Sequence, residues 1–343
     1  MAVAGQSQGG IYVGVNVLSP LSKALFNRAI IESSPAVIWT FPTAATALSI
    51  GTSFAIAAGC PGSEAAAAEC LRNLSVARIL QLQGTPSTTG PYTIGPFVDG
   101  NIIPMAAEQA WTTGHFNEMP ILGGGTKDEG AFMTGVTEYF SGPPQAPMTA
   151  DQYTQAIVAG AHCDGCPTGT MPAGLATRYP ISNYDGDPMI AYQRITTDAT
   201  RCAELHVLQR LAPQVASYAY DFTYQNAPYY FPKMPGYKPT AAHTIDIQFL
   251  FNNFHGSQLG VNLDQATGQP RELNETETKL SDQMVAAWTN FANSGNPNGS
   301  GNSPWPKFTA NDSGQYFVED IPLSMKSVSQ FRADYNCDFW DAL

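Results

Sequence analysis

The chain is poor in charged residues, especially basic ones, and has no long apolar segment. Only 13% of its 343 residues are charged, whereas 43% are hydrophobic, a composition that argues against disorder and favours a sizeable core. Its 16 basic residues against 28 acidic ones give a net charge of −12, which argues against nucleic acids and anionic membrane surfaces as partners. No apolar run is long enough to span a bilayer, so we predict no transmembrane helix.

Targeting and modular signals are also missing. The N-terminus shows no charged segment followed by an apolar stretch, so no signal peptide is visible. No internal repeat and no long linker is found in a chain whose length suits one large domain or two small ones.

Cysteines, in contrast, are present in an even number, which together with the low charge suits an exported protein with disulfides. The six are Cys60, Cys70, Cys163, Cys166, Cys202 and Cys337. Cys163 and Cys166 form a C-x-x-C motif beside His162, but no second C-x-x-C and no H-x-x-x-H supplies further zinc ligands. We therefore favour a structural disulfide there and predict no metal site.

Hydrophobic periodicity predicts strands that alternate with helices, which is typical of a mostly parallel sheet covered on its faces. The strands are expected near residues 1–4, 28–34, 119–125, 217–222 and 315–318. The helices are expected over residues 10–18, 63–83, 102–111, 196–212 and 276–294. Residues 141–190, rich in Pro, Gly and Asp, are expected to form irregular surface structure with short helices.

The motif with the clearest chemical meaning is Gly-Gln-Ser-Gln-Gly at residues 5–9. It resembles the nucleophile elbow of α/β-hydrolases, which exposes a serine on a sharp turn between a strand and a helix. The apolar residues 1–4 and 10–18 suit that strand and helix, although a glycine-rich loop between two packed elements is the alternative. A serine in this position becomes a nucleophile only if a base takes its proton and an acid orients the base.

The base is sought among five histidines, because in α/β-hydrolases the acid and then the histidine follow the serine along the chain. His243 directly precedes the apolar residues 244–251, which would fix its position. His206 is expected within a helix, and His115, His162 and His255 in loops. The residues alone make His243 a candidate without excluding the others.

Several ordered blocks resemble type B carboxylesterases, the family of cholinesterases and bacterial para-nitrobenzyl esterases. Beyond the elbow, residues 18–30, 97–100, 125–130 and 242–251 are similar to the family's LLSPLSRGLFHRAI, PVVDG, GxNKDEG and HxxEIxFVF. The resemblance covers essentially the whole chain. It implies an α/β-hydrolase fold, with a mostly parallel central sheet and helices on both faces, of which residues 1–343 form the C-terminal two-thirds as one incomplete domain.

The resemblance implies a role for each matching residue. Ser7 is the nucleophile, Glu129 the orienting acid and His243 the general base, while the backbone N–H of Gln8 is an oxyanion donor. Asp128 is the rival acid, and the resemblance favours Glu129 because the family's acid is the second one of Asp-Glu-Gly.

Other positions match less decisively or depart from the family. Ser33 resembles a serine near the triad and Trp39 an acyl-pocket tryptophan, although a polar strand end and ordinary core packing explain them equally well.

Family members usually carry glutamate before the nucleophile and alanine after it, where this chain has Gln6 and Gln8. Family members also have a long stretch before the elbow that holds the glycine-rich oxyanion loop and the first strands. We therefore expect residues 1–343 alone to be essentially inactive and poorly soluble.

The cysteine pairing implied by the resemblance is Cys60–Cys70 as a local bridge and Cys202–Cys337 as a bridge to the C-terminus. Cys163 and Cys166 are left to pair locally if at all. The alternative is six reduced cysteines in a cytosolic protein.

The resemblance thus implies a serine carboxylesterase that hydrolyses a small-molecule ester through an acyl-serine intermediate, without a cofactor. The alternatives are a non-catalytic cholinesterase-like interaction module, which typically lacks the nucleophile, and an inactive fragment. A secreted or periplasmic location fits, with any signal peptide in the missing N-terminal part.

Overall fold

The computed structural model describes residues 1–34, 41–62, 65–83, 95–161, 163, 170–252, 254–256 and 260–343. Within them, a six-stranded sheet has its strands side by side in chain order. The strands are β1 (Val3–Gln6), β2 (Ala29–Glu32), β3 (Ile121–Thr126), β4 (Ser217–Phe222), β5 (Gln315–Glu319) and β6 (Ser324–Ser327). Strands β1 to β5 are parallel, whereas β6 runs antiparallel to β5. The predicted mostly parallel sheet is confirmed.

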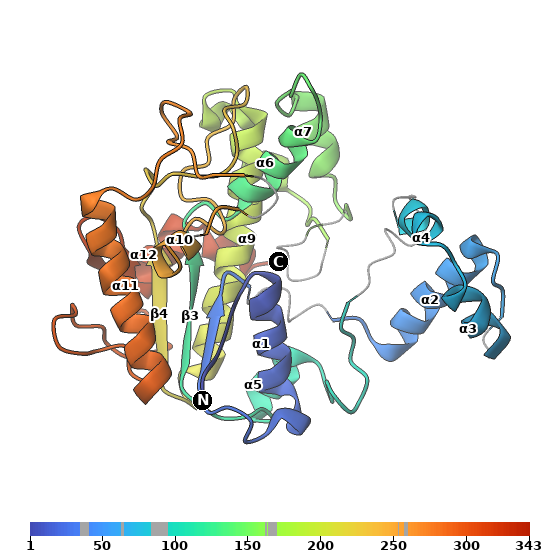
Figure 1. Cartoon of the computed structure of the whole chain (residues 1–343), viewed down its shortest axis with the longest axis horizontal. Coiled ribbons are helices and arrows are strands. Elements are labelled where there is room, and N and C mark those ends of the chain that lie inside the picture. Colours follow the sequence, from blue (N-terminus) through green and yellow to red (C-terminus); the bar gives the residue numbers. More distant parts are fainter. Residues whose placement is uncertain are drawn as a thin grey trace.

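Helices cover both faces of this sheet (Figure 1). Those described are α1 (Gln8–Leu18), α2 (Ala44–Ala58), α3 (Ala65–Arg72), α4 (Val76–Gln83), α5 (Ala107–Thr113), α6 (Gly130–Tyr139), α7 (Ala150–Ala156), α8 (Leu175–Arg178), α9 (Pro188–Leu211), α10 (Ile247–Leu250), α11 (Glu275–Ser294), α12 (Val328–Asp334) and α13 (Cys337–Trp340), with 3-10 turns η1 (Pro20–Ser22) and η3 (Ile181–Tyr184). Among these helices, none is both long and apolar enough to cross a membrane.

The alternation of side chains along each strand assigns the helices to their faces. Ile30, Leu122 and Tyr220 belong to the core under α11. Ala29, Ile31 and their neighbours face the opposite way, toward α1, α5 and the C-terminal turns of α9. Since β2, β3 and β4 are buried along their whole length, the sheet is the centre of the molecule.

Helix ends follow capping chemistry that the periodicity alone did not reveal. We expected a helix over residues 196–212, but α9 begins at Pro188 because the Asp187 side chain accepts hydrogen bonds from the N–H groups of Met189 and Ile190. Residues 63–83, expected to be helical, form two helices rather than one continuous helix. Helix α3 ends at Arg72 and α4 begins at Val76 after Ser75, whose hydroxyl accepts a hydrogen bond from the N–H of Arg78.

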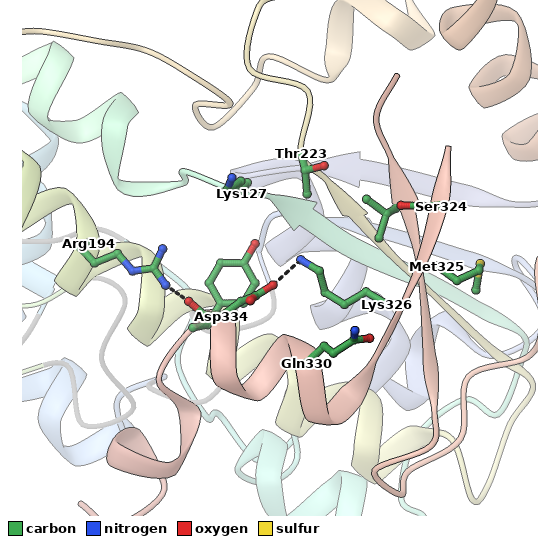
Figure 2. Close-up of a pocket in the computed structure, with 10 residues that line it drawn as sticks. Lys127, Arg194, Thr223, Ser324, Met325, Lys326, Gln330 and Asp334 are labelled. Carbon is green, nitrogen blue, oxygen red and sulfur yellow. Dashed lines mark hydrogen bonds and ion pairs between the residues drawn. The ribbon is translucent and has the colours of Figure 1, made fainter. Parts of the chain in front are cut away.

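Strands β1 and β6 lie at the two edges of the sheet. Strand β1 is only partly buried, and no other strand pairs with its outer edge within the described residues. Beside this edge, a largely apolar hollow of about 330 Å³ lies between β1 and α11, with Gln6 and Trp288 in its lining. Strand β6, which the sequence analysis did not predict, contributes Ser324, Met325 and Lys326 to a second hollow beside α12 (Figure 2).

Helices α2, α3 and α4 form a small lobe to one side of the sheet (Figure 1). A disulfide between Cys60 and Cys70 links the loop after α2 to α3. Large apolar side chains on α2 and α4 are exposed, among them Leu48, Val76 and Leu80.

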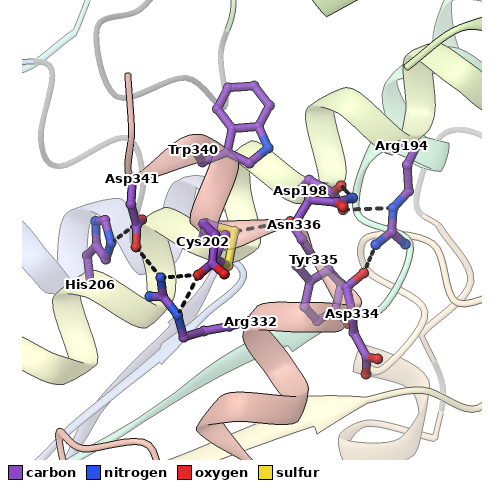
Figure 3. The surroundings of a disulfide bond; sticks show 12 residues. Arg194, Asp198, Cys202, His206, Arg332, Asp334, Tyr335, Asn336, Trp340 and Asp341 are labelled. Carbon is purple, nitrogen blue, oxygen red and sulfur yellow. Dashed lines mark hydrogen bonds and ion pairs between the residues drawn. A yellow bond between two sulfur atoms is a disulfide. The ribbon is translucent and has the colours of Figure 1, made fainter. Parts of the chain in front are cut away.

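A second disulfide, Cys202–Cys337, fastens the C-terminal segment to the middle of α9. Ion pairs surround it (Figure 3): the Arg332 guanidinium lies 2.7 Å from the Asp341 carboxylate, which also lies 2.7 Å from the His206 imidazole. The two disulfides are the pairs that the family resemblance implies. Cys166 lies outside the described residues.

We predict that replacing the long bridge by serines (Cys202→Ser with Cys337→Ser) lowers the free energy of unfolding by about 2–5 kcal/mol. The matched control is Cys60→Ser with Cys70→Ser, which opens a loop with a sequence separation of 10 rather than 135 and should cost less, because a longer closed loop restricts the unfolded chain more. Urea unfolding of both variants makes the comparison. An equal or larger loss for the Cys60–Cys70 variant would contradict it.

Three buried carboxyl groups interact electrostatically with one another and with Tyr220: those of Glu32, Asp246 and Glu319. The Tyr220 hydroxyl donates to Asp246 at 3.3 Å, and the Trp288 indole N–H donates to Glu32. Burial, together with the charge of Asp246, raises the pKa of Glu32 to about 8. Burial and the charge of Glu129 raise the pKa of Asp246 to about 6. At neutral pH the Glu32 carboxyl is therefore mostly protonated.

This raised pKa makes stability depend on pH. The folded protein holds a proton on Glu32 that the unfolded chain releases near pH 4.5, so stability falls as pH rises from that value to about 8, by at most about 1.4 kcal/mol per pH unit for one proton. Glu32→Gln keeps the acceptor for Trp288 and should make the fall from about pH 5.5 to about pH 8.5 shallower. Urea unfolding at both values measures this, and an unchanged pH dependence in the variant would refute the assignment.

Candidate active site

Ser7 lies where the chain turns sharply from β1 into α1. Its φ of 57° and ψ of −123° form a combination that non-glycine residues rarely adopt, and such strain is often found at functional sites. The turn is held by the Ser7 N–H, which donates to the Glu32 carbonyl at 2.9 Å. It also requires glycine, because a Cβ atom at Gly5 would lie 2.4 Å from the Gly9 backbone. Steric contact within the turn therefore explains Gly5, whereas a Cβ atom at Gly9 would meet no atom within 4 Å.

Glu129 and His243 meet beyond the carboxyl ends of β3 and β4. The Glu129 carboxylate forms a short hydrogen bond with His243 Nδ1. Its other oxygen accepts the backbone N–H of Thr126 at 2.8 Å. Burial alone would raise the pKa of Glu129, but the charge and hydrogen bond of His243, followed by the charge of Arg201, leave that pKa below its usual value. Conversely, burial lowers the pKa of His243, and the charge and hydrogen bond of Glu129 more than offset it, so that the pKa is raised.

Asp128 holds the loops that carry this pair. Its backbone N–H donates to the Ala241 carbonyl at 3.0 Å, and its side chain accepts the Ala241 N–H at 3.1 Å. The same carboxylate accepts a hydrogen bond from the Gln225 amide. Asp128, the rival acid, therefore lies against the backbone two residues before His243, while Glu129 contacts the imidazole.

His243 is further fixed through its backbone and ring. The Tyr229 hydroxyl donates to the His243 carbonyl at 2.8 Å, and the Phe132 ring lies 5.4 Å from the imidazole, centroid to centroid. These contacts leave Nε2 as the ring nitrogen available for proton transfer, because Nδ1 faces Glu129.

The Gln6 side chain, rather than Ser7, approaches that nitrogen. The Gln6 amide nitrogen lies 3.3 Å from His243 Nε2 and 3.5 Å from Nδ1. In the described part of the chain, the Ser7 hydroxyl makes no hydrogen bond to His243. The backbone N–H of Gln8, at the start of α1, has no hydrogen-bond partner among the described residues either. This N–H is therefore available to donate a hydrogen bond to a group next to Ser7.

A buried ion-pair network lies behind Glu129. Arg201 is fully buried, 2.5 Å from Glu204 and 3.0 Å from Asp221. A Cβ atom at Gly125 would lie 2.4 Å from the Arg201 guanidinium and 2.5 Å from Glu129, so glycine at this position allows the two side chains to lie together. Burial raises the pKa of Glu204 to about 8, although the charge of Arg201 opposes the rise.

The structure places the remaining candidate residues as follows. Ser33 is buried near Glu129 and helps to lower the pKa of that carboxyl, although no hydrogen bond of standard geometry joins them. His206 pairs with Asp341, and His115 contacts the Thr113 hydroxyl. Trp39 and His162 lie outside the described residues.

Comparison with known proteins decides the family. The sequence profile described as "Carboxylesterase family" matches residues 1–340. The chain belongs to the carboxylesterase family. Similar proteins include Carboxylesterase 3 of Pongo abelii (26% identical, over 98% of this chain and 57% of the relative), Liver carboxylesterase 1 of Mus musculus (27%, 100% and 59%) and Acylcarnitine hydrolase of Mus musculus (27%, 94% and 54%). The chain thus spans only a little over half the length of these relatives.

For this carboxylesterase-family chain, sequence reasoning missed the Gln6–His243 contact and the network of Arg201, Glu204 and Asp221. The first had a signal, since Gln6 replaces the glutamate usual in the family. The second had a weaker signal, two opposite charges three residues apart within a predicted helix.

Gln6→Glu should raise the pKa of His243 further, because a carboxylate near Nε2 stabilises the imidazolium. If His243 acts as a base, the acidic limb of the pH–rate profile then moves to higher pH. NMR titration of the His243 ring protons in the wild type and the variant measures the shift. Gln109→Glu on α5 is the control, since Gln109 is exposed and makes no hydrogen bond to His243. A His243 pKa that is unchanged or lowered by Gln6→Glu would be incompatible with this contact.

Proposed function

We propose that this chain carries the catalytic triad of a serine carboxylesterase, with Ser7 as nucleophile, His243 as general base and Glu129 as its orienting acid. The observation that carries the proposal is the hydrogen bond between buried Glu129 and His243 Nδ1 on loops beyond β3 and β4, in a family chain that carries Ser7 on its β1–α1 turn. The substrate class is a small-molecule carboxylic ester.

In this mechanism, Gln6 first releases His243 Nε2 so that the nitrogen can accept the Ser7 proton. The Ser7 oxygen then attacks the ester carbonyl, and the N–H of Gln8 donates to the resulting oxyanion. Protonated His243 returns its proton to the departing alcohol, which leaves an acyl-serine. Water, deprotonated by His243, then attacks the acyl-serine carbonyl, and His243 returns that proton to the Ser7 oxygen as the carboxylic acid leaves. Glu129 stays ionised throughout and stabilises the imidazolium.

The alternative of a non-catalytic interaction module is less well supported. Ser7, Glu129 and His243 are all retained, and Glu129 already orients His243. The disulfides Cys60–Cys70 and Cys202–Cys337 favour an oxidising compartment, and we propose a secreted or periplasmic location.

Ser7→Ala should reduce hydrolysis of p-nitrophenyl acetate by the protein that carries residues 1–343 by on the order of 10⁴-fold or more, because the acyl-serine cannot form. Labelling by a fluorophosphonate probe, in which the serine oxygen bonds to phosphorus and fluoride leaves, should be lost in parallel. Ser313→Ala, a change on the exposed surface, is the matched control. Hydrolysis that persists in Ser7→Ala at the wild-type rate would refute the nucleophile.

A further inference from the structure

His243 lies in a long segment without regular secondary structure. Residues 223–246, between β4 and α10, form no helix or strand. No ladder of strand hydrogen bonds fixes this segment, so its buried backbone N–H and carbonyl groups need other partners. The side chains that supply those partners decide where the imidazole lies.

The backbone is strained on both sides of His243. Thr240 has a φ of 49° and Thr244 a φ of 75°. A positive φ is unusual for a β-branched residue, and it persists only where the surrounding contacts impose it. The contacts of Thr240 and Thr244 therefore set the position of the imidazole between them.

Two tyrosines hold the C-terminal side of this strained segment. The Tyr230 hydroxyl lies 2.7 Å from the Thr244 hydroxyl, and the Tyr229 hydroxyl donates to the His243 carbonyl at 2.8 Å. Thr244 is thereby fixed through its own side chain.

A single glutamine, Gln265, holds the N-terminal side. Its Oε1 accepts the Thr240 N–H at 3.1 Å, and its Nε2 donates to the Thr240 carbonyl at 3.1 Å. The side-chain amide thus pairs with both backbone groups of Thr240, as a neighbouring strand would. The same Nε2 lies 2.7 Å from the Ala227 carbonyl oxygen and 3.0 Å from that of Gln225. Gln265 therefore ties the start of the segment to the residues just before His243.

Gln265 can impose this position because its own turn is well fixed. The preceding residue, Asp264, accepts the N–H of Thr267 at 2.8 Å through its side chain, a common way to stabilise a turn. Leu263 and Tyr229 exchange backbone hydrogen bonds of 2.8 Å in both directions. The turn is thus joined to the same segment that it holds.

The residue after Thr240 is held from the side of the acid. The Asp128 carboxylate, next to Glu129 in the chain, accepts the Ala241 N–H at 3.1 Å. Thr240 and Ala241 are therefore fixed by two different loops, and this pair of contacts brings His243 to Glu129.

We propose that Gln265 is a positioning residue for the general base: it holds the strained backbone at Thr240 so that His243 Nδ1 meets Glu129. Within the described residues, Gln265 makes no hydrogen bond to Ser7, Glu129 or His243, so it acts through the backbone alone. Its effect on catalysis rests on the proposed function, whereas its effect on the geometry of His243 does not.

The test compares Gln265→Ala and Gln265→Met in the protein that carries residues 1–343. Methionine keeps a side chain of similar length but removes both hydrogen-bonding groups, which separates hydrogen bonding from packing. Gln269→Ala is the matched control, because Gln269 follows on the same turn, is exposed and forms no side-chain hydrogen bond within the described residues. Circular dichroism and thermal unfolding establish which variants are folded, and Gln265→Met decides if Gln265→Ala does not fold.

The first readout is the pKa of His243, measured by NMR titration of its ring protons. The charge and hydrogen bond of Glu129 raise this pKa, and the charge of Asp246 adds to the rise. Both Gln265 variants should lower the pKa toward the ordinary value of histidine, because a displaced imidazole loses part of its interaction with Glu129. Gln269→Ala should leave it unchanged. This measurement needs no esterase activity.

The second readout is the hydrolysis of p-nitrophenyl acetate. Both Gln265 variants should lower kcat about tenfold to a hundredfold and leave KM unchanged, because a misplaced base slows proton transfer without altering substrate contacts. A wild-type pKa of His243 in a folded Gln265 variant would overturn the proposal, as would wild-type values of pKa and kcat in Gln265→Met alone, which would make Gln265 a packing residue. A lowered pKa in a protein without esterase activity would support the positioning role and refute the proposed function.

Discussion

The structure depends most on one buried charge, the guanidinium of Arg201. From α9 it reaches Glu204 on the same helix and Asp221 on β4. Asp221 in turn accepts hydrogen bonds from Lys326 on β6 and from the Tyr335 hydroxyl after α12. The guanidinium also lies 5.0 Å from the centre of the Phe331 ring. Because removing one partner of such a network leaves an uncompensated buried charge, it holds helix, sheet and C-terminal segment in one arrangement. The next residue, Cys202, adds a covalent link to the same segment.

This arrangement also shapes the electrostatics of the Glu129–His243 pair. The charge of Arg201 helps to keep Glu129 ionised although it is buried, and an ionised Glu129 is what raises the pKa of His243. Glu32, with its pKa raised to about 8, is mostly neutral at pH 7. The interior thus keeps Glu129 charged beside the imidazole and neutralises Glu32 by protonation.

Much of the site could be predicted from the sequence. The turn at Ser7 depends on Gly5, because a Cβ atom there would lie 2.4 Å from the backbone of Gly9. The contact of Glu129 rather than Asp128 with His243 follows the family's order of residues. Strand β4 matches its predicted bounds, because its apolar residues fit a strand buried on both faces. The start of α9 was predicted too late, because the hydrophobic periodicity does not show the N-cap at Asp187. Strand β6 was missed because Ser324–Ser327 is a polar edge strand with little hydrophobic signal.

What the sequence by itself determined is therefore local or ordered along the chain: the elbow, the alternation of strands and helices, and the succession of serine, acid and histidine. Tertiary structure alone decided that the Gln6 amide lies against the His243 imidazole, and that Arg201 is buried among acids. The physical reason is the distance along the chain over which each effect acts. Steric limits act between neighbouring residues, whereas the energy of a charge depends on which distant segments exclude water from it and supply its partner.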